Sequence, residues 1–269
     1  MRTTDFTSIR VEQRNVDSVF LKRLVIVDFY IPDAVFGPGG LHLLLINDGQ
    51  DLVKMNFTGM LEGLLGNGAI QPLMCVGIHA GEDRRMEYGT AKVLDYIGRG
   101  AKAAAYNSFV INELLPLIEK EFSAQPFKSR NIAGFSLGGL SAIDITWNHP
   151  QIFTTAGIFS GSLWWRSKDV SHGYDEHFDR IMHRQIRERD YHAGLRFYFT
   201  TGSLDEVADR NNNGIIDSID DTVALIDELQ KKGYTHNDIA YKNYEDGRHD
   251  VETWGRAMPG FLHWGWQVQ

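Results

Sequence analysis

The sequence predicts an α/β protein in which a mostly parallel, doubly wound sheet is flanked by helices. Apolar segments typical of strands buried on both faces alternate along the chain with segments that carry an apolar helical stripe. In addition, Ser136 stands between two glycines at a point where one such strand gives way to a helix. Ligands of doubly wound sheets bind beyond the carboxyl ends of the strands, so we expect the functional site at that edge.

The predicted strands are rich in Leu, Ile, Val and aromatic residues and show no strict alternation. They are Arg23–Ile31, Leu41–Ile46, Leu73–His79, Asn131–Ala133, Thr155–Phe159, Leu195–Thr200 and Ile239–Tyr244. The predicted helices are Ala101–Phe122, Gly138–Asn148, Asp221–Lys232 and Val251–Trp266. Segment 166–191 is dense in charge and histidine, and we expect it to pass over the face that carries the site. Without a repeat or a linker, the whole chain, 1–269, is expected to form one domain.

Composition narrows the class of partner. With 27 basic and 35 acidic residues the net charge is −8, which disfavours nucleic acid or an anionic membrane as the main partner and favours a small molecule. Only Cys75 is present, so no disulfide can form within the chain, and its apolar neighbours predict a buried strand residue. The amino terminus is too polar for a signal peptide and no run approaches about 20 apolar residues. We therefore expect a cytoplasmic protein, unless a leader was removed.

The segment Gly134-Phe135-Ser136-Leu137-Gly138 has the form of a nucleophile elbow. In this device the serine occupies a sharp turn between strand and helix, and small flanking residues are needed because a Cβ would collide with neighbouring backbone. The alternative is a glycine-rich turn with an incidental serine. The strand before it and the helical spacing of Leu140, Ile143 and Trp147 after it favour the elbow, and with it an enzyme.

A nucleophilic serine needs a histidine to take its proton and a carboxylate to orient that histidine. In this architecture the chain order is Ser, then Asp or Glu, then His. His249 follows a late strand and is the preferred base, with a helix-capping or surface role as the alternative. Asp205, in the loop after the preceding strand, is the preferred acid, and its neighbour Glu206 is the alternative.

Acyl transfer also needs two donors aimed at the developing oxyanion. One is expected to be the backbone amide of Leu137, which follows the nucleophile at a helix amino terminus. The other is expected from the turn after an early strand, where the amides of Gln50 or Asp51 could point inward. The alternative for that turn is an ordinary one without a functional role.

Several segments together resemble the putative esterase branch of the α/β-hydrolases, the group of ferric enterobactin (enterochelin) esterases, whose relatives include feruloyl esterases, S-formylglutathione hydrolase and mycolyltransferases. Besides the elbow, they are the strand ending Tyr30-Ile31-Pro32, the turn Leu45-Ile46-Asn47-Asp48-Gly49-Gln50, Val76-Gly77-Ile78 with Arg84-Arg85-Met86-Glu87-Tyr88, Glu113-Leu114-Leu115-Pro116, Ser160-Gly161-Ser162-Leu163-Trp164-Trp165, and Gly247-Arg248-His249-Asp250 with Trp254. Two departures are Arg248, where the family often has a second glycine, and Asp rather than Glu at the acid position.

The resemblance implies an α/β-hydrolase fold and a set of site residues. Ser136 would be the nucleophile, His249 the base, Asp205 the acid, and Gln50 with Leu137 the oxyanion donors. It also implies that Arg85, Trp164 and Trp165 line the acyl or alcohol pocket. For the two tryptophans, packing beneath segment 166–191 is the alternative.

Residues 209–220 match a calcium-binding loop, with oxygen side chains at positions 1, 3, 5, 9 and 12 and glycine at position 6. The predicted ligands are Asp209, Asn211, Asn213, Ile215 through its carbonyl, Asp217 and Asp220. The loop departs from the usual pattern in its Asp at position 12 and in its poor incoming helix. An asparagine-rich turn without metal is the alternative. A bound calcium ion would be structural and would brace the loop that carries Asp205.

These observations predict a serine esterase that hydrolyses a carboxylic ester through an acyl-enzyme intermediate, without an organic cofactor. A siderophore ester or an acylated carbohydrate is the expected kind of substrate, and the protein is expected to be a monomer or small homo-oligomer. The alternatives are an acyltransferase on the same fold and a non-catalytic binding protein for a siderophore or carbohydrate.

Overall fold

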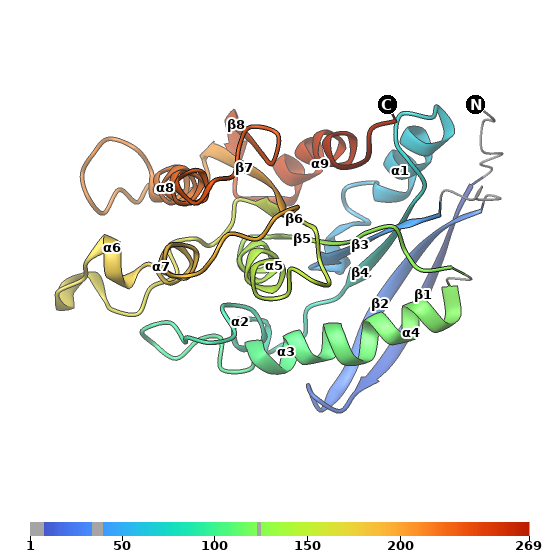
Figure 1. Ribbon diagram of the computed structural model, residues 1–269, viewed down its shortest axis with the longest axis horizontal. Coiled ribbons are helices and arrows are strands. Elements are labelled where there is room, and N and C mark those ends of the chain that lie inside the picture. Colours follow the sequence, from blue (N-terminus) through green and yellow to red (C-terminus); the bar gives the residue numbers. More distant parts are fainter. Residues whose placement is uncertain (1–7, 34–39, 123–124, 269) are drawn as a thin grey trace.

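A computed structural model describes residues 8–33, 40–122 and 125–268. Eight described strands form one sheet in the order β1-β2-β4-β3-β5-β6-β7-β8 (Figure 1). Their bounds are Ser8–Ser18 for β1, Arg23–Asp33 for β2, His42–Asn47 for β3, Leu73–Ile78 for β4, Arg130–Phe135 for β5, Thr155–Phe159 for β6, Arg196–Leu204 for β7 and Ile239–Arg248 for β8. The sheet confirms the predicted mostly parallel α/β architecture.

The pairing changes direction once along the sheet. From β4 to β8 all neighbours are parallel, whereas β1 pairs with β2 and β2 with β4 in antiparallel fashion. The strand β1 was not predicted from the sequence. It lies at the edge of the sheet, and most of its side chains are exposed or half-buried, so its sequence is polar and lacks the apolar run that marks the other strands.

Helices cover both faces of the sheet (Figure 1). On one face lie α1 (Phe57–Gly66) and α9 (Val251–Trp266), and on the other lie α5 (Leu137–Asn148) and the continuous stretch of α3 (Ala103–Phe109), the π-helical η2 (Val110–Leu114) and α4 (Leu115–Phe122). Beyond them, on the side of β7 and β8, are α7 (Ile181–Glu188) and α8 (Asp217–Lys232). The short elements are η1 (Gly49–Asp51), α2 (Arg84–Glu87), η3 (Val170–His172) and α6 (Glu176–Asp179).

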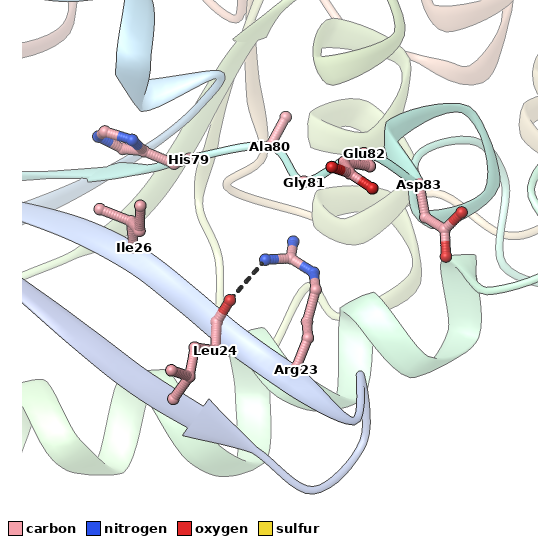
Figure 2. A pocket seen from close by; sticks show the side chains of 8 residues that line it. All are labelled: Arg23, Leu24, Ile26, His79, Ala80, Gly81, Glu82 and Asp83. Carbon is pink, nitrogen blue, oxygen red and sulfur yellow. Dashed lines mark hydrogen bonds between the residues drawn. The ribbon is translucent and has the colours of Figure 1, made fainter.

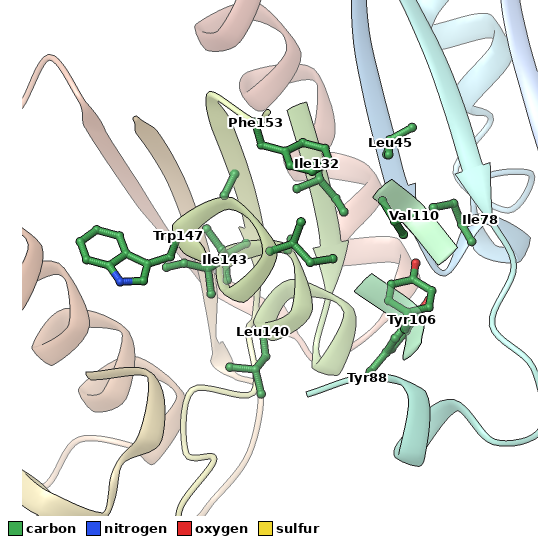
Figure 3. Close-up of a cluster of buried hydrophobic side chains, with 14 of the residues drawn as sticks. Leu45, Ile78, Tyr88, Tyr106, Val110, Ile132, Leu140, Ile143, Trp147 and Phe153 are labelled. Atoms are coloured by element: carbon green, nitrogen blue, oxygen red, sulfur yellow. The ribbon is translucent and has the colours of Figure 1, made fainter. Parts of the chain in front are cut away.

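Two apolar clusters, one on each face of the sheet, hold these layers together. The larger cluster packs side chains of β3, β4 and β5 against α3, η2 and α5, and Figure 3 shows Ile132, Tyr106, Val110 and Ile143 among its members. The second cluster joins the opposite face of the sheet to α1 and α9. Because the central strands are buried on both faces, the carboxyl ends of β5, β6, β7 and β8 are held in fixed positions, and these ends carry the site.

The other predicted elements agree with the structure within a few residues, but the helices α1, α2, α6 and α7 were not predicted. The helix α1 lies between β3 and β4, and its three glycines obscure the apolar stripe in the sequence. The predicted helix Ala101–Phe122 is present as the α3, η2 and α4 stretch. Cys75 is fully buried in β4, as predicted, and burial raises the pKa of its thiol. None of the described helices combines the length and apolar character that a bilayer crossing requires.

Candidate active site

Ser136 lies at the sharp turn between β5 and α5. Its backbone has φ 55° and ψ −120°, a left-handed conformation that is strained for any residue with a Cβ. The turn brings the first turn of α5 onto the end of β5, so that a Cβ on Gly134 would lie 2.3 Å from the Gly138 carbonyl oxygen. Only glycine fits at position 134. The backbone geometry is that of a nucleophile elbow, as the sequence predicted.

A cavity of about 410 Å³ opens beside Ser136 at the carboxyl ends of the strands. Ser136, Asp205 and His249 all line it, although they come from β5, β7 and β8 and are separated by up to 113 residues of sequence, from 136 to 249. The full lining is Arg84, Arg85, Arg99, Ser136, Leu137, Ser160, Gly161, Ser162, Trp164, Asp205, Glu206, Ser218 and His249. The three residues of the expected triad therefore meet at one cavity.

The Ser136 hydroxyl is held by a second serine. Its Oγ lies 3.3 Å from Ser162 Oγ, and the Ser162 backbone amide donates to the Ser136 carbonyl at 3.0 Å. Ser162 is 3% exposed and lies three residues after the end of β6. From the sequence, the segment around Ser162 carries only a family resemblance, and no role was predicted for Ser162. A serine two residues beyond another serine at the end of a buried strand was the available signal.

Asp205 follows β7 where that strand bulges. Between Gly202 and Leu204 the pairing with β8 shifts register, and the two strands approach so closely that a Cβ on Gly202 would lie 2.4 Å from the Gly247 carbonyl oxygen. The Asp205 Oδ2 accepts from the Gly202 amide at 3.0 Å and from Ser218 Oγ at 2.9 Å. Its Oδ1 is buried and has no hydrogen-bond partner among the described residues. A buried carboxylate oxygen without a donor is costly, so this one is available to a donor that moves into place.

His249 directly follows β8 and faces both Asp205 and Arg84. The residue is exposed to solvent, but the protein packed around the ring lowers the pKa of the imidazole below its usual value, the Asp205 carboxylate raises that pKa, and the Arg84 guanidinium lowers it. A lowered pKa favours the neutral ring that a proton acceptor requires. Within residues 8–33, 40–122 and 125–268 the structure gives the ring no hydrogen bond. Such contacts are often long in an enzyme without substrate and tighten when it binds.

Glu206, the alternative acid, also lines the cavity. Burial raises the pKa of its carboxyl, and the Ser218 backbone amide, which donates to it, lowers that pKa. No electrostatic effect of Glu206 on His249 accompanies that of Asp205. The carboxylates that raise the pKa of the imidazole are Asp205 and, less strongly, Asp250, so Asp205 stays the preferred acid.

Of the two residues expected to supply oxyanion donors, Leu137 belongs to the lining of the cavity and Gln50 does not. Leu137 is the first residue of α5 and lines the cavity, while the amides of Gly139 and Leu140 donate to the Ser136 carbonyl. The turn after β3 packs on the same helix end, because the Asn47 side chain donates to the Gly138 carbonyl at 2.8 Å. In that turn the Asp51 amide donates to the Asp48 carbonyl at 3.0 Å. The Asp51 amide is therefore already used, and the role of the Gln50 amide as the second donor stays a prediction.

Three arginines line the cavity, and two of them have a carboxylate partner. Arg84 makes two hydrogen bonds to buried Asp48, at 2.7 and 2.8 Å, and Arg99 pairs with buried Asp95. The Arg85 guanidinium has neither a hydrogen bond nor an ion pair among the described residues. Arg85 therefore contributes the uncompensated positive charge of this group.

The two tryptophans of the 160–165 segment differ in position. Trp164 lines the cavity, and the Arg99 guanidinium lies 4.8 Å from its ring centroid. Trp165 is fully buried outside the cavity, with its ring against the backbone of Gly89 and Gly100. The expectation that Trp165 lines the pocket was wrong. The two tryptophans lie in a turn, in which the Trp165 amide donates to the Ser162 carbonyl at 3.2 Å, and in this turn only Trp164 faces the cavity.

A second cavity of about 410 Å³ lies apart from these residues, between the β1–β2 hairpin and the loop after β4 (Figure 2). It is lined by Arg23, Leu24, Ile26, His79, Ala80, Gly81, Glu82 and Asp83. His79 is held there by buried Asp28, whose Oδ2 lies 2.6 Å from the ring Nε2. No serine or cysteine lies in the lining, so this cavity has no group suited to acyl transfer.

The predicted calcium loop is closed by bonds among its own groups. The Asp209 carboxylate accepts from the amides of Asn213 and Gly214, and the Asn213 side chain donates to Asp220. Arg210 pairs with Asp217 at 3.2 Å, within the loop. In the described part of the chain, no three or more His, Cys, Asp or Glu side chains are grouped to hold a metal ion. Calcium binding stays a prediction.

A sequence profile described as "Putative esterase" matches residues 18–264. The chain belongs to the putative esterase family. Among curated relatives, the uncharacterized protein YbbA of Bacillus subtilis is 30% identical over 135 residues, 48% of this chain and 53% of that protein. An endo-1,4-beta-xylanase/feruloyl esterase of Xylanibacter ruminicola is 29% identical over 107 residues, 39% of this chain and 14% of that protein. This chain thus matches about half or less of the length of these two relatives.

Solved structures of this family share the fold. The enterobactin esterase FES of Shigella flexneri, crystallised in the presence of enterobactin, superposes with a TM-score of 0.73 at 22% identity and covers 95% of this chain and 58% of that one. The BES protein of Bacillus cereus superposes with a TM-score of 0.68 at 20% identity, covering 96% and 95%. The sheet and flanking helices described above are those of an α/β-hydrolase, as predicted from the sequence.

Proposed function

We propose that this protein is a serine esterase in which Ser136 is the nucleophile, His249 the general base and Asp205 the acid that orients it. The observation that carries the proposal is the meeting of these three side chains at one cavity, with Ser136 in the strained conformation of a nucleophile elbow. Membership of the esterase family supports the same reaction class.

In the proposed reaction the Ser136 Oγ attacks the ester carbonyl carbon while His249 takes the hydroxyl proton. The carbonyl oxygen becomes an oxyanion, held by the backbone amides of Leu137 and Gln50. His249 then protonates the leaving alcohol, and the acyl group remains on Ser136. A water molecule, deprotonated by His249, releases the acid and restores the serine. No step needs an organic cofactor.

Asp205 has the environment that this role requires. Two donors occupy its Oδ2, and its buried Oδ1 is left for the Nδ1–H of the histidine. That hydrogen bond would fix the tautomer in which Nε2 accepts the serine proton, and the carboxylate would stabilise the imidazolium that forms. The ring has to rotate or shift to make this bond, which is common between resting and substrate-bound forms.

The expected substrates are a siderophore ester or an acylated carbohydrate, and the lining of the cavity bears on the choice. Arg85 offers one uncompensated positive charge and Trp164 an aromatic surface, a combination that suits an ester with an anionic or phenolic group. A neutral acylated sugar would make no use of the charge. We infer that Arg85 and Trp164 contact the substrate.

A panel of esters tests the proposal. Purified protein would be assayed with aryl acetates, feruloyl esters, acetylated sugars and ferric enterobactin, alongside Ser136→Ala and His249→Ala. A fluorophosphonate probe should label the protein at Ser136, and mass spectrometry of the labelled peptide identifies the site. Absence of labelling together with absence of turnover would refute the esterase and favour a non-catalytic binding protein. Transfer of the acyl group to an added alcohol, in preference to water, would identify an acyltransferase instead.

We further propose a structural role for calcium at residues 209–220. The loop starts four residues after Asp205, and the same helix α8 supplies Ser218, which donates to the Asp205 carboxylate. An ion that ordered this loop would therefore also order the acid. The protein is expected to act as a monomer or small homo-oligomer.

A further inference from the structure

The base histidine sits immediately before a capped helix. Asp250 is the N-cap of α9, and its side chain accepts from the Thr253 amide at 2.8 Å. The Thr253 hydroxyl oxygen in turn accepts from the Arg248 amide at 2.9 Å, which ties the end of β8 to the helix. His249 is therefore the residue before the N-cap, and Trp254 is the fourth residue after the N-cap. Side chains at these two positions meet in many helices and fix the angle at which the chain enters the helix.

In this protein the two side chains are aromatic, and they are in contact. The ring centroids of His249 and Trp254 are 5.2 Å apart, and the ring planes are inclined at 83°, an edge-to-face arrangement. The two rings can meet through local helix geometry, because only four residues lie between His249 and Trp254 in the chain. The contact fixes one side of the imidazole by packing rather than by a hydrogen bond.

Trp254 also contacts the strand that carries the nucleophile. Its ring stacks on that of Phe135, with centroids 5.2 Å apart and planes inclined at 18°, and Phe135 directly precedes Ser136. Its indole N–H donates to Ser160 Oγ at 3.2 Å. Ser160 follows β6, is 2% exposed and has a φ of 44°, so its side chain is held in place by a constrained backbone. The indole itself is 8% exposed.

We propose that Trp254 is a positioning residue that sets the place of the His249 ring relative to Ser136. This inference rests on the proposed esterase function. The Trp254 side chain contacts the ends of three strands. It packs on Phe135 at the end of β5, donates a hydrogen bond to Ser160 after β6, and packs against His249 after β8. Rotation of the imidazole toward Asp205 or Ser136 then takes place against a fixed aromatic surface. Displacement of a catalytic group by about 1 Å can cost about 100-fold in rate.

The charges that face His249 make its pKa a measure of where the ring lies. His249 is exposed to solvent, and three charged groups face it: Asp205 after β7, Arg84 in α2 and Asp250 at the start of α9. The two carboxylates raise the pKa of the ring, and the Arg84 guanidinium lowers it. A ring that leaves its place against Trp254 changes its distance to each of these charges. The pKa of His249 would then change, independently of whether substrate is present.

The test compares two substitutions on α9. In Trp254→Leu the aromatic surface is lost, whereas in Trp266→Leu an equally buried tryptophan of the same helix is lost. Trp266 is 2% exposed and packs edge-to-face on Phe261, with centroids 5.4 Å apart, outside the cavity lining. The pKa of His249 is measured by NMR titration of the histidine ring protons, and kcat and KM are measured on an aryl acetate.

In Trp254→Leu we expect a changed pKa for His249 and a fall in kcat of about 10- to 100-fold, with KM changed by less than about 3-fold. Trp266→Leu should lose stability but keep the parent pKa and kcat. Trp254→Phe, which keeps an aromatic ring and loses the hydrogen bond to Ser160, should recover most of the kcat and remains informative if the leucine variant does not fold. An unchanged pKa of His249 in Trp254→Leu, or the same change in Trp266→Leu, overturns the inference. Because the titration needs no turnover, it decides the role of Trp254 even if Ser136→Ala shows that the esterase proposal is wrong.

Discussion

Replacing Asp205 by Asn removes one charge and leaves the shape of the side chain. The side-chain oxygen of the Asn can still accept from the Gly202 amide and from Ser218, which are the partners of Oδ2 in the parent. The amide NH₂ then occupies the place of the unpartnered Oδ1. A donor in that place cannot accept the Nδ1–H of His249, so the ring is favoured in the tautomer that has its proton on the wrong nitrogen.

The expected loss in kcat is about 10⁴-fold, the size seen when a triad carboxylate is replaced by its amide in serine proteases. That ratio corresponds to about 5 kcal/mol of transition-state stabilisation. Folding stability should change little, because both hydrogen bonds to the retained oxygen survive. The substitution also removes the charge that raises the pKa of His249, so the acidic limb of the pH profile should move to lower pH.

Glu206→Gln is the matched control, since Glu206 is adjacent and lines the same cavity. Steady-state kinetics on an aryl acetate and the rate of fluorophosphonate labelling measure both variants, and thermal unfolding verifies that each is folded. We expect Glu206→Gln to stay within about 3-fold of the parent kcat, because Glu206 exerts no comparable effect on His249. A kcat within 10-fold of the parent for Asp205→Asn, or a larger loss for Glu206→Gln, would refute the assignment of the acid.

Four further predictions concern the nucleophile, the base, the cavity lining and the calcium loop. By calorimetry, Ser136→Gly should unfold at a temperature about 2 to 4 °C above that of Ser136→Ala. Glycine relieves backbone strain of about 1 to 3 kcal/mol at φ 55°, and it costs about 0.5 to 1 kcal/mol in chain entropy. An equal or lower unfolding temperature for Ser136→Gly contradicts this prediction. Because burial lowers the pKa of His249, kcat/KM should stay constant from pH 8 down to the usual imidazole pKa of about 6.5 and fall only below it, and a fall above that pH counts against His249 as the base. Arg85→Gln should lower kcat/KM about 10-fold for an anionic ester and leave a neutral aryl acetate unchanged, with Arg85→Lys intermediate, whereas equal effects on both esters would exclude a charge contact. Saturating calcium should raise the unfolding temperature by about 5 to 10 °C relative to EDTA, and Asp209→Ala should abolish that increase; identical melting curves would remove the calcium site.

The local sequence was sufficient for the features that depend on a few neighbouring residues. The elbow at Ser136 was predictable because its strained turn tolerates only glycine at position 134, a requirement that is visible in the letters themselves. The position of His249 after a late strand followed from the alternation of strands and helices. The parallel part of the sheet was predictable because strands buried on both faces are continuously apolar, without alternation of apolar and polar residues.

The features that depend on which segments meet required the tertiary structure. The polar edge strand β1 is recognisable only once β2 is seen to pair with it. Asp205 was already preferred to Glu206 from the sequence, but only the structure shows that one buried Asp205 oxygen, just after the bulge in β7, has no donor among the described residues. Trp165 is fully buried outside the cavity that Trp164 lines, because the turn between Ser162 and Trp165 places the two side chains in different surroundings.

The sequence by itself thus determined the fold class, the nucleophile turn and the family of this chain. The tertiary structure decided which loop carboxylate has a buried oxygen without a donor among the described residues, which arginine has no ion-pair partner among them and which tryptophan packs against His249. The physical reason is the separation along the chain between the residues that interact. Backbone strain and apolar periodicity act between residues close in the chain, whereas desolvation, charge pairing and ring packing act between residues brought together only by folding.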